Sequence, residues 1–364
     1  MNSAKAIRTS IFASFPFLAL AASALHGQVA ERVVFAPAEG TSLTKTFVTS
    51  VEMTMDDMEM LMNGEESPMM GDIEMLMTSE QVMTVTDKYV KMAEGQPAVL
   101  HRTYDELMME LEIDMSMEMM GNIQEQSPSG GGTSPLEGKT VVFELGDEGY
   151  STSFAEGEDG DDDQLSGLSE DLDLRALLPE SGSAEVGGSW DIQLSTLADV
   201  FAPGGDPGWE VEIDGEGISA PGMSPDMMSQ MRQFFGDLVE GTAQGELTEI
   251  REGEDGKIAV IAISMEIETA ADIVEMMEAQ MEDEAGLPPG MEIAIDRADV
   301  EFMADGEGVL LWNLSTNHAV SFSCETETRM IQDIGMAMEM SGQSIEMEMA
   351  SEMSGTMKLE VEVE

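Results

Sequence analysis

The sequence predicts a mainly β protein of the α+β type: a strongly curved antiparallel sheet or half-barrel with one or two packed helices. Three observations predict this fold. Apolar and acidic residues alternate over long segments, hydrophobic residues make up 42% of the chain, and only one segment has a well-marked helical spacing. Alternation with a period of two turns one set of side chains toward a core and the other toward water.

Residues 1–24 have the pattern of a secretory signal peptide. Two basic residues precede an apolar stretch at 11–20, and small residues follow at 22–24. The apolar stretch is too short to span a bilayer, and no later segment is long and apolar enough to be a transmembrane helix. We therefore expect cleavage after Ala24, export to the periplasm or the exterior, and no integral membrane segment.

The chain is strongly acidic. It has 74 acidic residues against 15 basic ones, a formal net charge of −59. Such a chain repels itself when compact, so we expect salt or weakly bound divalent cations to stabilise it. Nucleic acids and anionic lipid surfaces require basic residues, which excludes nucleic acid as a partner.

Strand patterns occur along most of the mature chain. In one of the clearest, Val51, Met53 and Met55 share one face while Glu52 lies on the other. Turn-forming residues at 94–97, 254–256 and 305–308 separate neighbouring strands. The expected strands lie near 41–62, 72–92, 97–119, 139–154, 244–251, 257–269, 291–304, 308–330 and 334–363, the last one divided.

These segments suggest a division of the chain. After the signal peptide we expect an N-terminal antiparallel sheet (25–121), a flexible linker or loop rich in Gly, Ser and Pro (122–138), and a central part with strands, an acidic loop and a helix (139–241). A C-terminal antiparallel sheet (242–364) follows. Both sheets are rich in Glu-Met pairs, which is compatible with two similar halves or with similar composition alone.

The best-marked helix spans 224–241. Ser224 can cap it, Pro225 suits its first turn, and apolar residues then recur at helical spacing until Gly241. Shorter helices are expected over 165–178 and, with less support from the pattern, over 270–284.

Methionine is the first candidate for a functional role, with 36 residues in the chain. Methionine-lined surfaces adapt to varied partners, so a pliable cavity for an apolar small molecule or lipid is one interpretation. Its candidate ligand-binding residues are Met53, Met55, Met115, Met117, Phe234 and Phe235. Thioethers also suit Cu(I), but no histidine lies inside a methionine cluster. The third interpretation is a core in which methionine is the generic apolar residue.

The acidic loop at 156–163 is the second candidate. Its carboxylates can attract Ca²⁺, a hard ion that takes several oxygen ligands. The candidate metal ligands are Asp159, Asp161, Asp162 and Asp163. The spacing is not that of an EF-hand, and charge runs of this kind are usually solvated loops, so we expect weak association with divalent cations.

Catalytic motifs are lacking. The mature chain retains only His101 and His318 beyond the signal-peptide junction, and neither lies in a hydrolase, nucleotide-binding or zinc-protease motif. We expect no catalytic residue and no cofactor. Cys324 is the only cysteine, so an internal disulfide is excluded, and it is expected to be a small apolar strand residue.

Two segments carry a resemblance. Leu178-Pro179-Glu180 followed by 185–190 (Glu-Val-Gly-Gly-Ser-Trp) resembles an element of uncharacterised exported bacterial β-proteins, and 306–317 resembles their hairpin, with Asn313 and Asn317 in place of the usual Asp and Gly. Those proteins are similar in outline to curved-sheet lipoprotein carriers of the LolA and LppX type. The resemblance covers the C-terminal half and implies a fold, not an activity. Trp190 and Trp312 are expected to be core residues.

Together these observations predict an exported, non-catalytic binding protein that holds an apolar or lipid-like ligand on a concave methionine-rich face, with the helix at 224–240 as lid or plug. If the concavity is filled, a structural or envelope interaction protein is the alternative. Binding of Cu(I) by methionine, or of Ca²⁺ by the acidic loop, is a further alternative.

Overall fold

The computed structural model describes residues 30–66, 73–119, 122–147, 149–214, 240–274, 277, 291–340 and 343–364. The expected signal peptide (1–24) and the expected helix at 224–241, with Phe234 and Phe235, lie outside these residues. So does most of the helix expected at 270–284, whose first residues belong to a strand.

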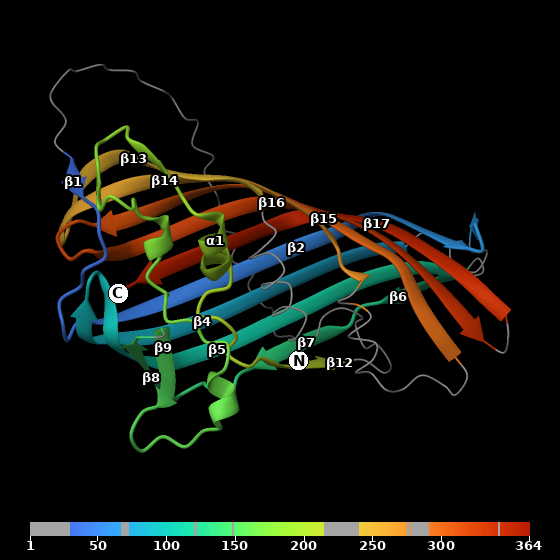
Figure 1. Ribbon diagram of the computed structural model, residues 1–364, viewed down its shortest axis with the longest axis horizontal. Coiled ribbons are helices and arrows are strands. Elements are labelled where there is room, and N and C mark those ends of the chain that lie inside the picture. The colour runs from blue at the N-terminus through green and yellow to red at the C-terminus, as the bar shows by residue number, and fades with distance from the viewer. Residues whose placement is uncertain are drawn as a thin grey trace, which may run out of the picture.

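The mainly β prediction is confirmed: one large, twisted antiparallel sheet dominates the molecule (Figure 1). Within the described residues it has 15 strands, and its main path runs β11-β13-β14-β15-β16-β17-β2-β4-β5-β7-β12. The N-terminal strands are β2 (Ser42–Met62), β3 (Glu65–Glu66), β4 (Ile73–Ala93), β5 (Gln96–Met119), β6 (Asn122–Gln126), β7 (Ser129–Thr133), β8 (Thr140–Gly146) and β9 (Gly149–Phe154). The later strands are β11 (Ser189–Asp191), β12 (Glu210–Asp214), β13 (Glu240–Gly253), β14 (Gly256–Asp272), β15 (Met291–Asn313), β16 (His318–Met340) and β17 (Gln343–Val363). A separate two-stranded sheet pairs β1 (Glu31–Arg32) with β10 (Ser183–Ala184).

The central strands are unusually long. β5 has 24 residues, and β15 and β16 have 23 each. At a rise of about 3.3 Å per residue, such a strand extends over roughly 75 Å. Strands of this length extend past the packed core, so one end of the sheet is covered by the core and the other end is not.

The N-terminal and C-terminal groups of strands form one continuous sheet. β17, near the end of the chain, pairs with β16 on one side and with β2 on the other, with Val361 opposite Phe47. The two groups predicted from the sequence are thus joined edge to edge by the strand that ends the chain.

Hairpin turns connect the neighbouring strands. The turn between β4 and β5 is Glu94-Gly95, both with positive φ (51° and 84°), as tight hairpins of twisted strands require. The turn expected at 94–97 is therefore present, and the turn expected at 254–256 connects β13 to β14, with Gly253 opposite Gly256.

The prediction of a turn at 305–308 is wrong, because β15 runs without interruption from Met291 to Asn313. The actual turn follows Asn313, which also divides the expected strand at 308–330. Gly306 faces the core, where a Cβ would lie 2.8 Å from Thr326 Oγ1 and 3.0 Å from Met265 Cγ. The glycine therefore makes room for larger neighbours instead of reversing the chain.

Two other predictions are corrected. Residues 122–138 are not simply a flexible linker, because they contain β6 and β7, which pair with β5. The helix expected at 165–178 is absent. Only the short 3₁₀ turns η1 (Asp162–Leu165) and η2 (Arg175–Leu177) occur there, and Leu174 takes a left-handed φ of 57° that interrupts any helix.

The core occupies one face at one end of the sheet. Residues 162–201, here called the cover segment, cross this face and include the short helix α1 (Leu194–Phe201), which the sequence analysis did not predict (Figure 1). Its leucines pack into the same cluster as Phe47, Phe322 and Trp312. Among the described residues, no helix has the length and apolar character needed to cross a membrane.

Candidate functional site

The face of the sheet that carries the core continues beyond the cover segment as a methionine-rich surface. Residues alternate faces along a strand, and directly paired residues share a face, so the pairing register assigns each side chain. We call this surface the methionine face. Its methionines with described side chains are Met53, Met55, Met58, Met60, Met62, Met75, Met77, Met109, Met115, Met117, Met330, Met336, Met338, Met347, Met349, Met353 and Met357.

The methionine face differs from the core in exposure. Met83 and Met265, on the same face under the cover segment, are 2% and 5% exposed and belong to the contiguous core cluster. Met53 is buried but lies outside that cluster, and the other methionines of the face are half-buried. The chain thus presents an apolar, sulfur-rich surface that is partly accessible.

Rows of methionine cross this face from strand to strand. Met55 lies opposite Met353, which lies opposite Met330, so one row spans β2, β17 and β16. Met75 lies directly opposite Met115 on β4 and β5. Flexible thioether side chains in such rows can adjust to ligands of different shape.

The predicted ligand-binding methionines therefore share one face. Met53, Met55, Met115 and Met117 come from β2 and β5, with β4 between them. The alternation of methionine with acidic residues was a sufficient signal for this part of the site. The sequence did not indicate where the strands would separate.

The sheet forks between β2 and β4. Their pairing ends at Thr54 and Leu76, although β2 continues to Met62. At the same point β2 has a bulge: Met55 pairs with Met353 and Asp57 with Glu352, which leaves Asp56 as an extra residue. A bulge bends its strand and increases the local twist, so β2 follows β17 while β4 stays with β5.

A cavity of about 730 Å³ lies in this fork. Met55, Met75 and Met115 line it from the methionine face. Glu74 and Asp114 occupy alternate positions on β4 and β5 and line it from the opposite face of the sheet. The fork cavity therefore joins an apolar surface to an acidic one.

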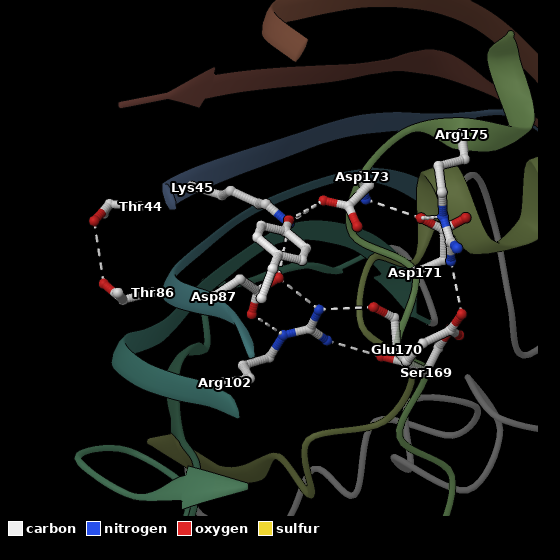
Figure 2. Close-up of polar contacts among 11 residues, drawn as sticks. Thr44, Lys45, Thr86, Asp87, Arg102, Ser169, Glu170, Asp171, Asp173 and Arg175 are labelled. Carbon is white, nitrogen blue, oxygen red and sulfur yellow. Dashed lines mark hydrogen bonds and ion pairs between the residues drawn. The ribbon is translucent and has the colours of Figure 1, made fainter. Parts of the chain in front are cut away.

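Under the cover segment, three charged residues occupy core positions of neighbouring strands. Lys45 Nζ lies 2.7 Å from Asp87 Oδ2, and Arg102 Nε lies 2.7 Å from Asp87 Oδ1 (Figure 2). Each of the three is at most 1% exposed. We call these residues, with Asp173, the buried ion cluster.

The buried ion cluster binds the cover segment to the sheet. Lys45 Nζ lies 2.5 Å from Asp173 Oδ1, and the hydroxyl of Tyr89 donates to the same oxygen. Arg102 donates to the backbone carbonyls of Ser169 and Glu170, each at 2.8 Å. These four contacts explain why an irregular segment keeps a defined position on the sheet.

The two buried carboxyl groups have opposite pKa shifts. Burial opposes ionisation of Asp87, but the charges of Arg102 and Lys45 and their hydrogen bonds outweigh it and lower its pKa to about 2. Burial raises the pKa of Asp173, as do the charges of Asp171 and Asp87, against the opposing effect of Lys45. Asp87 is therefore the anion to which both cations are bound.

The sequence analysis missed this cluster, although a signal was present. Lys45 lies between Leu43 and Phe47 in the alternation, and Asp87 and Arg102 likewise have large buried neighbours two residues away on either side. A charged residue at such a position requires a partner. With only 15 basic residues in the chain, two of them at core positions is an informative pattern.

The remaining candidates are dispersed. Asp159, Asp161, Asp162 and Asp163 are exposed, and Asp161 caps η1 by accepting from the backbone of Asp163. No group of three or more His, Cys, Asp or Glu with metal-binding geometry occurs in the part of the chain that the structure describes. The structure gives the acidic loop no defined cation site.

The other residues singled out by sequence have structural positions. Cys324 is buried on β16, where burial raises the pKa of its thiol. Trp312 is fully buried, and Trp190 on β11 packs over Gly245 and donates to the carbonyl of Leu177 at 3.1 Å. His101 and His318 lie on β5 and β16, strands separated by three others in the sheet order.

No protein-family model matches the chain, and a search of curated proteins gives no match. The resemblance to lipoprotein carriers consequently depends on the motif residues alone. The site must be interpreted from its own geometry.

Proposed function

We propose that this chain is an exported, non-catalytic binding protein that holds an apolar, lipid-like small molecule on the methionine face. One observation carries the proposal. A single sheet face is closed by the cover segment over one end and presents half-buried methionines over the other.

The arrangement suits binding of an adaptable kind. The covered end supplies a rigid support through its packed core, while the methionine rows supply a soft apolar surface. The fork cavity adds a recess whose volume falls in the usual range for small-molecule sites. Export is part of the proposal because residues 1–24 have the pattern of a signal peptide.

Native mass spectrometry of the protein, purified without detergent, tests this function. We expect a bound apolar molecule as a defined mass increment. It should be lost from the double variant Met75→Gln/Met115→Gln, which makes the fork end of the methionine face polar. Val309→Gln is the matched control, because Val309 is 41% exposed on the opposite face of the sheet. Equal retention in both variants would show that the molecule binds elsewhere.

A second experiment tests accessibility directly. Mild peroxide should oxidise Met55, Met75 and Met115 before Met83 and Met265, and a bound ligand should slow only the first group. Oxidation at equal rates without ligand, or no protection with it, argues for the alternative of a structural protein with a filled interior.

Binding of Cu(I) is the second candidate, favoured by the cross-strand row of Met55, Met353 and Met330. Anaerobic titration against a competing chelator tests it. An affinity no better than micromolar eliminates this candidate, whereas tight binding abolished by Met353→Leu would support it.

A further inference from the structure

The fork cavity has different chemistry on its two sides. Toward the methionine face its wall is formed by the thioethers of Met55, Met75 and Met115. Toward the opposite face its wall carries carboxylates. The change occurs within one residue step along each strand, because Met75 is opposite Met115 and the next pair is Leu76 and Asp114.

The charge of the cavity has one sign. Its lining includes five acidic residues and, within the described residues, no Lys, Arg or His. These acidic residues are Asp56, Asp57, Glu74, Asp114 and Glu125. Within the described residues, every ion pair involves other carboxylates. Arg329 on β16, which pairs with Glu352, lies near enough to Asp56 for their charges to interact but does not line the cavity. A ligand group held there must be neutral or cationic, since an anion would meet several like charges at close range.

We propose that the fork cavity selects amphiphiles with a cationic headgroup, with the apolar tail on the methionine face and the ammonium-type head between the carboxylates. This inference depends on the proposed function and specifies its ligand class. The cavity and the methionines that open into it define the site, and the carboxylates determine the sign of the charge it accepts. The fork supplies the passage because β2 and β4 no longer pair beyond Thr54 and Leu76.

The test compares three probes with the same twelve-carbon tail, each below its critical micelle concentration: dodecyltrimethylammonium, dodecyl maltoside and dodecyl sulfate. Binding is measured by titration calorimetry at constant ionic strength. We expect the ammonium probe to bind at least about tenfold more tightly than the maltoside, with the sulfate weakest.

Variants separate the cavity from the general acidity of the chain. Asp57→Asn/Glu74→Gln/Asp114→Asn should reduce binding of the ammonium probe about tenfold and leave the maltoside unchanged. The control Glu266→Gln/Asp305→Asn/Glu327→Gln removes the same charge from β14, β15 and β16, on the face of the sheet opposite the methionine face and away from the fork. It should leave binding of both probes nearly unchanged. Circular dichroism checks that both triple variants retain the sheet.

The outcomes are distinguishable. If no probe binds, the proposed function fails and this inference fails with it. If all three bind equally, the methionine face remains a binding surface and the cationic preference is wrong. If the control variant weakens the ammonium probe as much as the cavity variant, the overall charge of the protein attracts the probe and the fork cavity has no selective role.

Discussion

Asp305 on β15 lies directly opposite Glu327 on β16, with both side chains exposed on the face of the sheet that carries no core. Glu266 on β14 lies directly opposite Asp305 on its other side. Three carboxylates therefore form a row across adjacent strands. Like charges at such positions destabilise a sheet, typically by a few tenths to about 1 kcal/mol per pair.

Asp305→Asn should consequently stabilise the protein by about 0.5–1 kcal/mol, because it removes two repulsive pairs at once. Thermal unfolding at low salt measures this. Glu360→Gln is the control, since Glu360 faces Ser323 and Val48 and should change stability little. Salt should reduce the benefit of Asp305→Asn, because it screens the repulsion that the substitution removes. A benefit that does not depend on salt would contradict this explanation.

Asp87→Asn should destabilise the protein by about 3–5 kcal/mol, because Lys45 and Arg102 would remain buried without their shared anion. Chemical denaturation measures the change. Lys358→Met is the comparison, since Lys358 and Glu325 form a largely exposed pair and its loss should cost less than about 1 kcal/mol. Similar losses in both variants would mean that the cluster contributes no more than a surface pair.

The stabilising effect of Asp87 should depend on pH in the acid range. Its pKa is about 2 in the folded protein and 3.8 in the unfolded chain, so its ionised form stabilises the fold above pH 3.8. This contribution is lost as the pH falls through about 2, and it amounts to about 2 kcal/mol. The difference in unfolding free energy between the native chain and Asp87→Asn should therefore shrink between pH 5 and pH 2. A constant difference would show that Asp87 is not preferentially ionised in the fold.

Gly306→Ala should destabilise the protein by about 1–3 kcal/mol, because the new methyl group would crowd Thr326 and Met265. The double variant Gly306→Ala/Met265→Ala should recover part of this loss by making space, although it removes apolar packing of its own. Unfolding midpoints of the single and double variants measure the coupling. Strictly additive effects would show that the glycine does not act by accommodating Met265.

The sequence predicted the sheet because alternation extends through each long strand, as in β2 and β17. The same pattern correctly placed Met53, Met55, Met115 and Met117 on one face. It could not identify the fork, because the separation of β2 from β4 depends on pairing with β17, almost 300 residues later in the chain.

The roles of the strand glycines and of the buried charged residues were harder to predict from the sequence. Gly306 and Gly308 resemble a turn locally, but their role depends on side chains of two neighbouring strands. The partners of Lys45 lie 42 and 128 residues away, so the local sequence shows that a partner is needed without showing which residue it is. The cover segment follows from these long-range contacts and not from helix propensity.

The place of β17 has a consequence for biosynthesis. Residues 343–363 form an interior strand, yet a ribosome produces them after β2 and β16, the two strands between which they lie. Until they emerge, β2 and β16 each expose a long unpaired edge that can recruit another chain. The joining of β2 to β16 therefore waits for residues 343–363, and a nascent chain stalled before residue 343 should be prone to aggregation and dependent on chaperones.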